Sequence, residues 1–283
     1  MAGIAEVVLA CDRANVSCSA ALGRREVIEF VVGQEAAAGA LGSGLDELRS
    51  VLRTCASRHR QIIWAKANLP LHPHPPGSSP VVIALSPSED SVQRSVESLI
   101  EAATQKQIAV QRRYRAPDGP NAASVASSVQ GPGSTVLLGA DLEVSPNPES
   151  GWDAVLTHAK PDSRASLVKV PHHGSEGAHH NRMWSDVVAK EAVAIVTPWA
   201  KGKAFLPTQP DLDRLRTVAE TVYISAMPVL RELTMDSERG ALVRRLHRTR
   251  IEELRGWGMV QVRRRAAEDG WRVVLEGDAV QVS

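Results

Sequence analysis

The sequence predicts a layered α/β (α+β) domain. Short β-branched and aliphatic runs, such as 81–85, 166–170 and 193–197, alternate with segments whose apolar residues recur at helical spacing. Hydrophobic residues make up 43% of the 283 residues, which is enough for a substantial core. Two of the strand-like runs end abruptly in Asp, His or Ser. This pattern is typical of strands whose ends place functional side chains in a cleft.

Composition narrows the class of protein. The 33 basic and 32 acidic residues give a net charge of +1, which offers no whole-protein argument for binding nucleic acid or an anionic membrane. No apolar run approaches the roughly 20 residues that span a bilayer, and the first residues lack the basic and apolar regions of an export signal. The three cysteines fit neither a zinc-finger spacing nor a paired disulfide framework. We therefore expect a cytoplasmic protein that does not associate with membranes.

The N-terminal part predicts a helix and then a loop. Apolar runs at 4–10 and 27–32 precede a segment, 45–55, whose leucines fall at helical spacing. The proline-rich segment 69–80 predicts a loop, because prolines remove backbone donors and bias the preceding residues away from helix. The following run, 81–85, predicts a buried strand.

A capping signal then predicts the start of a second helix. Ser86 is expected at the N-cap, Pro87 at the first helical position and Glu89 three residues into a capping box. The apolar residues from Val92 to Ala103 fall on one stripe of this helix. Together with strand 81–85, it forms the clearest strand-to-helix unit of the chain.

The rest of the chain predicts alternating elements and a C-terminal change of character. A hairpin is expected from strands 123–129 and 135–138. Further expected elements are a short helix over 152–157, strand 166–170, helix 183–189, strand 193–197, a helix after Pro210, strand 221–225, an Arg-rich helix over 242–254, and strands 260–262 and 271–275. We interpret 1–228 as the main domain and 229–283 as a small C-terminal α+β appendage.

Asp141 stands where a predicted buried strand ends. It follows Val136-Leu-Leu-Gly-Ala, in which the glycine lets the backbone pass tightly before the carboxylate emerges. A carboxylate at that place can bridge two divalent ions, because each of its oxygens can serve one metal. The alternative is a turn residue or a helix N-cap, the commoner role of an isolated Asp.

The segment His172-His173-Gly174-Ser175 is a stronger signal. Adjacent imidazoles after a buried strand, followed by a Gly-Ser pair that can present donors to a phosphate, suit a binding site. A purely structural histidine pair stays an open alternative. Asn121 and Ser124 can orient a ligand by hydrogen bonding, although turn capping is the commoner role of such residues. The candidate substrate-binding residues are therefore Asn121, Ser124, Gly174 and Ser175.

Three segments in this order resemble the soluble metallo-β-lactamase-fold domain of ComEC-type competence proteins and their free-standing relatives. They are Asn121-Ala-Ala-Ser-Val125, Val136-Leu-Leu-Gly-Ala-Asp-Leu-Glu143 and Lys169-Val-Pro-His-His-Gly-Ser175. The resemblance is specific within residues 121–175. It extends more loosely from Leu85 to the Leu206-Pro-Thr segment.

The resemblance implies an αββα sandwich that binds one or two zinc or other divalent ions, such as manganese, at its sheet edges. Many members of that superfamily hydrolyse phosphodiester bonds through a metal-bound hydroxide. By this resemblance Asp141 would be the bridging carboxylate, with His172 or His173 as a terminal ligand. We accordingly expect Asp141 and His173 as catalytic residues. Adjacent imidazoles on a turn rarely face one metal together, so the choice between the two histidines stays open.

One departure from the family pattern qualifies this expectation. The principal metal motif of the superfamily, His-x-His-x-Asp-His, is missing from the sequence. The nearest candidate, His72-Pro-His74, is followed by Pro75-Pro-Gly and lies in the proline-rich segment. Asp141 and a histidine supply fewer ligands than the three side chains of a usual catalytic zinc. We therefore expect an incomplete metal site and an incomplete sandwich in this chain alone.

Three explanations of the missing motif stay open. It lies upstream of Met1 in a longer protein, or a partner chain or second copy supplies it and completes the sheet, or the domain is a degenerate non-enzyme. The first two keep a metal-dependent hydrolase with a phosphodiester or nucleic-acid substrate. The third leaves a binding or scaffolding module. An exposed sheet edge where strands are missing would favour pairing with another chain.

Other residues near the candidate site have plainer interpretations. Trp152, Trp184 and Trp199 flank it and are interpreted as packing residues. The arginine clusters at 244–245 and 263–265 are interpreted as a solvated face, since acids and bases are nearly balanced in that part of the chain.

Overall fold

The structure, a computed structural model, describes residues 16–25, 28, 43–71, 80–104, 119, 121–201, 204–226, 258–265 and 270–282. The apolar run at 4–10, the histidines at 72 and 74, and the Arg-rich helix expected over 242–254 lie outside these ranges. The fold is mixed α/β, as the sequence predicts, and is built on one seven-stranded sheet. None of the helices in the described ranges is long and apolar enough to cross a bilayer.

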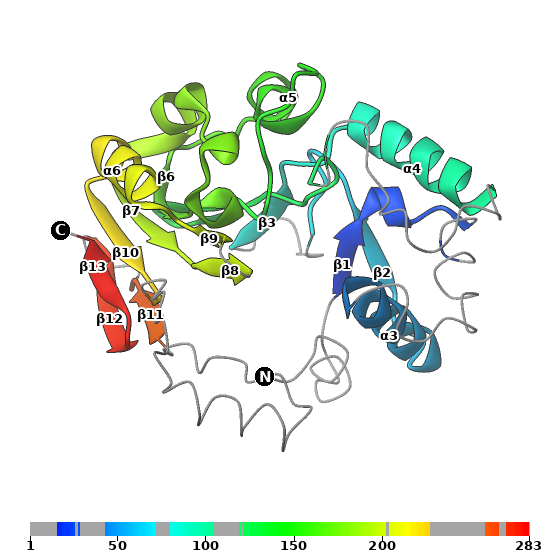
Figure 1. The fold of residues 1–283 in the computed structure, drawn as a ribbon, viewed down its shortest axis with the longest axis horizontal. Coiled ribbons are helices and arrows are strands. Elements are labelled where there is room, and N and C mark those ends of the chain that lie inside the picture. Colours follow the sequence, from blue (N-terminus) through cyan, green and yellow to red (C-terminus); the bar gives the residue numbers. More distant parts are fainter. Residues whose placement is uncertain are drawn as a thin grey trace, which may run out of the picture.

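The main sheet combines a parallel block with antiparallel strands at both sides (Figure 1). In spatial order its strands are β13 (Val280–Val282), β10 (Thr221–Ile224), β7 (Val188–Val196), β6 (Ala165–Lys169), β5 (Ser134–Leu138), β4 (Ser127–Gly131) and β3 (Val81–Ala84). Strands β5, β6, β7 and β10 are parallel to their neighbours within the block, and β3, β4 and β5 alternate in direction. The carboxyl ends of β5, β6, β7 and β10 therefore share one edge with the start of β4.

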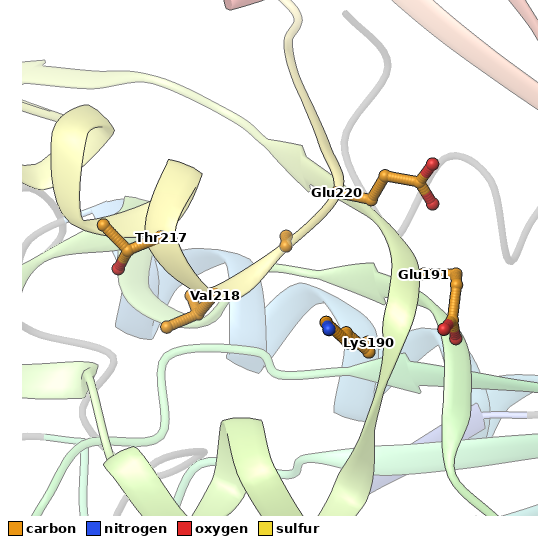
Figure 2. A pocket seen from close by; sticks show the side chains of 6 residues that line it. Lys190, Glu191, Thr217, Val218 and Glu220 are labelled. Carbon is orange, nitrogen blue, oxygen red and sulfur yellow. The ribbon is translucent and has the colours of Figure 1, made fainter.

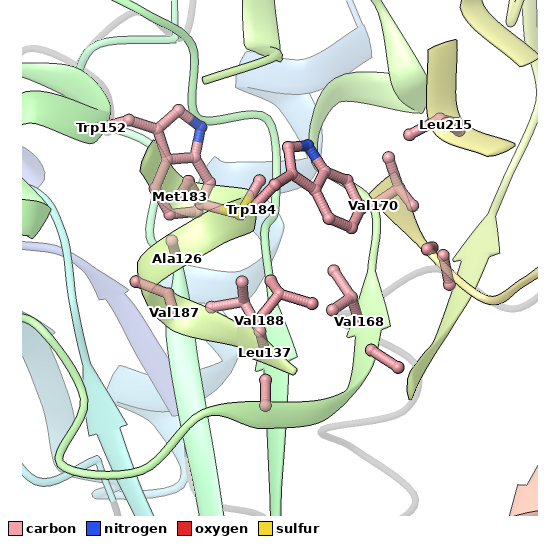
Figure 3. Packing of buried hydrophobic residues seen from close by; sticks show 14 of the residues in the cluster. Ala126, Leu137, Trp152, Val168, Val170, Met183, Trp184, Val187, Val188 and Leu215 are labelled. Atoms are coloured by element: carbon pink, nitrogen blue, oxygen red, sulfur yellow. The ribbon is translucent and has the colours of Figure 1, made fainter. Parts of the chain in front are cut away.

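One face of this sheet carries the main core. Inward side chains alternate along the strands, as period-2 geometry requires, and include Leu137 and Val168. They pack against α5 (Gly151–His158), the π-helical turn η5 (Met183–Val187) and α6 (Gln209–Val218). Figure 3 shows Trp152, Met183 and Trp184 over this strand face.

The opposite face of the sheet is covered less completely. Among its outward apolar side chains, Val136, Val193, Ile195 and Tyr223 are half-buried, Leu138 is exposed and Leu167 is buried. Each alternates with a fully buried neighbour on the core face. The sheet thus has one packed face and one partly covered apolar face.

A smaller unit forms from the N-terminal part. Strand β1 (Val16–Ser19) pairs in parallel with β2 (Ile62–Ala65), and the 3₁₀ turn η1 (Ala20–Leu22) and helix α3 (Ser43–Ser57) lie between them in sequence. Val16, Val51 and Cys55 form its core, and Cys18 packs against them. In Figure 1 this unit lies to the right of the main sheet, beside α4 (Glu89–Thr104).

The outer edge of β3 is paired with backbone from the segment that follows β2. Leu71 N donates to Val82 O at 2.8 Å, and Ala84 N donates to Leu69 O at 2.9 Å. The segment around Leu69 therefore protects this end of the sheet against pairing with another chain.

The C-terminal part adds a hairpin and an edge strand. β11 (Gly258–Arg263) pairs with β12 (Arg272–Gly277), as the predicted strands at 260–262 and 271–275 indicate. β13 pairs antiparallel with β10 in the main sheet. Trp271 Nε1 donates to Ser166 Oγ at 3.2 Å beside β6. The segment expected as an appendage thus contributes a strand to the main sheet.

Several sequence predictions are confirmed and others are wrong. The hairpin, the helices of α3 and α5 and strands β3, β6 and β10 form close to their expected positions. The expected helix over 183–189 ends after one π-helical turn, because Val188 already pairs with Ala165 in strand β7. The sequence missed β1, β2, β13 and the hairpin of β8 (Trp199–Lys201) with β9 (Ala204–Leu206).

The predicted N-cap of α4 is wrong by two residues. The helix begins at Glu89, and Ser88 Oγ accepts from Ser91 N at 3.1 Å. Ser86 is used elsewhere, since its hydroxyl donates to Ser124 O at 2.6 Å and accepts from Ala126 N at 2.8 Å. The Ser86 hydroxyl, which the local sequence predicts as the cap, therefore makes a tertiary contact instead.

Candidate functional site

The structure brings the predicted site residues together at the carboxyl edge of the parallel strands. Ligands of open α/β sheets bind at such edges, outside the ends of the strands. The loop after β5 carries Asp141, the turn after β6 carries His172 and His173, and Thr197 follows β7. Asn121 and Ser124 precede β4, whose start lies at the same edge.

Gly139 permits the close approach of the two loops that carry these residues. A Cβ at Gly139 would lie 2.8 Å from both the backbone nitrogen and Cβ of Pro171. Beyond it, His172 N donates to Ala140 O at 2.8 Å. The glycine that follows the buried strand in the sequence is therefore required by contact with the next strand's loop.

The turn Pro171–Gly174 (η3), here called the histidine turn, has an unusual backbone. His172, His173 and Gly174 have φ values of 41°, 57° and 81°, so three consecutive residues are left-handed. That conformation costs a residue other than glycine about 1–2 kcal/mol. Such a backbone persists where its surroundings hold it, and it is concentrated at functional sites.

Helix α6 holds the histidine turn from one side. Arg214 Nη2 donates to Gly174 O at 3.0 Å and to Asp211 Oδ1 at 2.6 Å. Asp211 and Thr208 form the capping box at the start of α6. Burial raises the pKa of Asp211, but the hydrogen bonds from Thr208 and Arg214 outweigh it and hold that pKa below its usual value.

His172 is bound to an acidic side chain that the sequence did not single out. Its Nδ1 lies 2.7 Å from Glu143 Oε1 and 3.3 Å from Ser175 Oγ, and Asn121 Nδ2 donates to Glu143 Oε2 at 3.1 Å. A carboxylate can only accept, so Nδ1 carries the proton. A neutral His172 then keeps its lone pair on Nε2. Glu143 could have been found as the second acid of the Asp141-Leu-Glu run.

His173 faces Asp141, the other acidic residue of the loop after β5. Its Nδ1 lies 2.9 Å from Thr197 O, a carbonyl that can only accept, so this nitrogen also carries a proton. The lone pair of neutral His173 is therefore on Nε2, which lies 3.9 Å from Asp141 Oδ1. A lone pair and a carboxylate repel each other unless a proton or a cation lies between them. This geometry distinguishes His173 from His172 as the partner of Asp141.

Asp141 is half-exposed and has two further neighbours. Its backbone N donates to Ser124 Oγ at 3.0 Å, which fixes the loop. Burial lowers the pKa of Lys169, and the negative charge of Asp141 acts in the opposite direction on that ammonium. Lys169 Nζ donates to Val170 O at 3.3 Å. Lys169 begins the segment Lys169–Ser175, but the sequence alone assigned no role to its charge.

The described side chains do not make a complete metal site. Ligand atoms about 2.0–2.1 Å from a tetrahedral zinc ion lie roughly 3.3–3.4 Å apart, so Asp141 and His173, now 3.9 Å apart, would have to approach each other slightly to share a metal. Within the described ranges, however, no three His, Cys, Asp or Glu side chains are grouped to hold an ion. A catalytic zinc takes three protein ligands. The described residues alone therefore do not supply a hydrolytic step.

The predicted packing role holds for two of the three flanking tryptophans. Trp152 and Trp184 are buried in the core. Trp199 is 38% exposed, and its ring stacks on the imidazole of His173 with centroids 6.3 Å apart. It therefore packs against one face of that imidazole.

Figure 2 shows a separate hollow of about 310 Å³. Its walls come from the start of β7 and the end of α6: Lys190, Glu191, Thr217, Val218, Ala219 and Glu220. Since the site residues follow the carboxyl ends of the parallel strands, this hollow belongs to the opposite edge of the sheet. None of the predicted site residues lines it.

Comparison with protein-family models, with curated proteins and with solved structures gave no match. The resemblance to the metallo-β-lactamase fold therefore stays a prediction from three sequence segments. What the site does has to be inferred from the pairs Asp141 with His173 and Glu143 with His172, and from the charge of Lys169.

Proposed function

We propose that this chain carries one half of a metal-dependent hydrolase site of the metallo-β-lactamase type and is inactive alone. The observation that supports this is the free Nε2 of His173 facing the carboxylate of Asp141 at 3.9 Å. Imidazole nitrogen and carboxylate oxygen both bind zinc, and carboxylate oxygen also binds manganese. A metal in such a site supplies an activated water, which suits phosphodiester hydrolysis.

The remaining ligands would come from outside the described residues. A longer protein, a partner chain or a second copy of the chain are the sources that would serve. The half-buried sheet face with Val136, Val193, Ile195 and Tyr223 supports this, because the second sheet of an αββα sandwich would cover it. The same face supports an incomplete sandwich as the fold.

The residues proposed to bind substrate also have structural contacts. Asn121 holds Glu143, Ser124 holds the backbone of Asp141, and Ser175 lies beside His172. Gly174 supplies the carbonyl that Arg214 binds. A phosphate would therefore approach groups that are already held in place, which lowers the cost of ordering them on binding.

A non-catalytic binding module is the second candidate, and one observation favours it. The charge of Asp141 acts on the half-buried Lys169, and Glu143 is bound by both His172 and Asn121. Protein groups thus compensate the charge of both acids without a metal. A domain of this kind would keep the loops as a surface without the reaction.

Metal titration separates the two candidates. Zinc and manganese would be titrated calorimetrically into the purified chain, with bound metal measured by elemental analysis. The half-site predicts weak binding of at most one ion, at least tenfold weaker in Asp141→Asn and in His173→Gln. His158→Gln is the matched control, since His158 pairs with Glu149 at 3.0 Å away from the site. Hydrolysis of bis(p-nitrophenyl) phosphate by the chain alone should not exceed the metal-only background.

The outcomes exclude each other. If the unmodified chain binds no metal, or if both variants bind metal as tightly as it does, the half-site is refuted and the non-catalytic module remains. Occupancy by two ions with hydrolytic activity would show instead that the chain holds a complete site.

A further inference from the structure

Exposed apolar side chains lie on the segments that carry the candidate site. Six large hydrophobic side chains are exposed in the described ranges, and half of them belong to these segments: Leu138, Val144 and Trp199. Leu138 ends β5 three residues before Asp141, Val144 directly follows Glu143, and Trp199 begins β8 just after β7. Binding sites for small molecules typically combine such apolar surface with a few polar groups. The site therefore offers a ligand apolar surface as well as acids and imidazoles.

Trp199 is held against the histidine that faces Asp141. Its ring stacks on the imidazole of His173 at an interplanar angle of 28°. Two residues earlier, Thr197 O accepts from His173 Nδ1 at 2.9 Å, so the backbone and the ring of one segment contact the same histidine. Trp199 also pairs with Leu206 across the hairpin of β8 and β9. The hairpin thus fixes the indole beside the proposed metal ligands.

Part of the Trp199 ring stays open to solvent. The residue is 38% exposed, whereas Trp152 and Trp184 are buried in the core. The imidazole of His173 stacks on one face of the indole, and an imidazole is the smaller ring. An aromatic ring that is held in place and partly exposed is a platform on which a second planar ring can stack.

We propose that Trp199 stacks on a planar ring of the substrate and that the substrate is a nucleotide-type phosphate ester. A nucleotide joins a planar base to phosphate through a sugar, so the base and the phosphate can contact neighbouring groups of one site. Every base has a π-face that an aromatic side chain can stack on. The inference deepens the proposed function and rests on it for the phosphate, which a metal at Asp141 and His173 would bind. The stacking itself requires no metal.

A purely structural role of Trp199 predicts a different result. An indole that only restrains His173 would influence the phosphate end of a ligand, whether or not the ligand carries a base. A stacking indole influences only ligands that carry the ring. Comparison of a probe with the ring and a probe without it therefore separates the two roles.

NMR titration of the purified full chain without added metal tests the proposal. The probes are AMP, adenosine, which lacks the phosphate, and ribose 5-phosphate, which lacks the ring. We expect AMP and adenosine to shift the Trp199 indole proton, which Trp199→Phe assigns, and ribose 5-phosphate to leave it unchanged. Trp199→Leu keeps apolar bulk without the ring and should weaken AMP binding at least about fivefold, whereas Trp199→Phe should stay within about twofold.

Leu275→Ala is the matched control, because Leu275 is also 38% exposed and lies on β12, in the hairpin with β11. It should bind AMP like the unmodified chain. Failure of AMP or adenosine to bind, equal binding of AMP and ribose 5-phosphate, unchanged AMP affinity in Trp199→Leu, or equal losses in the leucine and phenylalanine variants would each overturn the stacking.

The half-site is tested separately by the metal titration. Metal binding without binding of the ring would refute the stacking alone. Binding of the ring without metal binding would refute the half-site alone and leave Trp199 as a platform for aromatic ligands.

Discussion

Gly139→Ala should destabilise the protein by disturbing the contact between the two loops of the candidate site. The new Cβ would lie 2.8 Å from Pro171 N and Cβ and 2.9 Å from Pro171 Cα. These atoms belong to backbone and a closed ring, so no side-chain rotation can relieve the contact. One loop must move, and the bond from His172 N to Ala140 O, now 2.8 Å, must lengthen or break.

The magnitude follows from the cost of overpacking. An added methyl group in a close-packed place costs about 1–3 kcal/mol. In a domain of this size each kcal/mol lowers the melting temperature by about 2–4 °C, so we expect a decrease of roughly 2–12 °C. Because Asp141 and His173 are on the two displaced loops, the metal affinity of the half-site should fall as well.

Differential scanning calorimetry and metal titration would measure the two effects. Gly131→Ala is the matched control, because a Cβ there meets only Ser134 O and Oγ, both at 3.8 Å. Its free energy of unfolding should change by no more than about 0.5 kcal/mol. If Gly139→Ala melts with the control and binds metal like the unmodified chain, the contact does not hold the site together.

Two further predictions concern the elements that support the histidine turn. Thr208→Ala removes the cap of α6, whose hydroxyl accepts from Asp211 N, and should cost about 1 kcal/mol in urea unfolding; Thr208→Ser should restore it, and equal loss in both would contradict the cap. Acid should destabilise the fold in two stages. Burial, Arg214 and His180 lower the pKa of His179 below 6.5, so the unfolded chain binds that proton first and stability falls as pH drops through 6.5. Hydrogen bonds hold the pKa of Asp211 below 3.8, so its contribution is present above 3.8 and is lost at lower pH. Urea unfolding measured across pH would check both stages, and an unchanged upper stage in His179→Gln would contradict the first.

Local patterns in the sequence were sufficient for much of the fold. The hairpin of β4 and β5 follows from its Gly-Pro-Gly connection, and α5 and α6 follow from apolar residues at helical spacing. The cap of α4 was misplaced, because the local pattern Ser86-Pro87-Ser88-Glu89 favours Ser86 over Ser88. The choice between them depends on Ser124 and Ala126, which approach Ser86 only in the folded sheet.

The candidate site divides in the same way. The sequence by itself determined that Asp141, His172 and His173 follow the ends of buried strands, since an apolar run that stops at a polar residue is a local signal. Only the tertiary structure decided that His173 faces Asp141, that His172 is bound by Glu143, and that the charge of Asp141 acts on Lys169. The physical reason is that β5 and β6 pair in one register, with Leu138 beside Lys169. Register is fixed by packing across the whole sheet, and it determines which side chains of neighbouring loops meet.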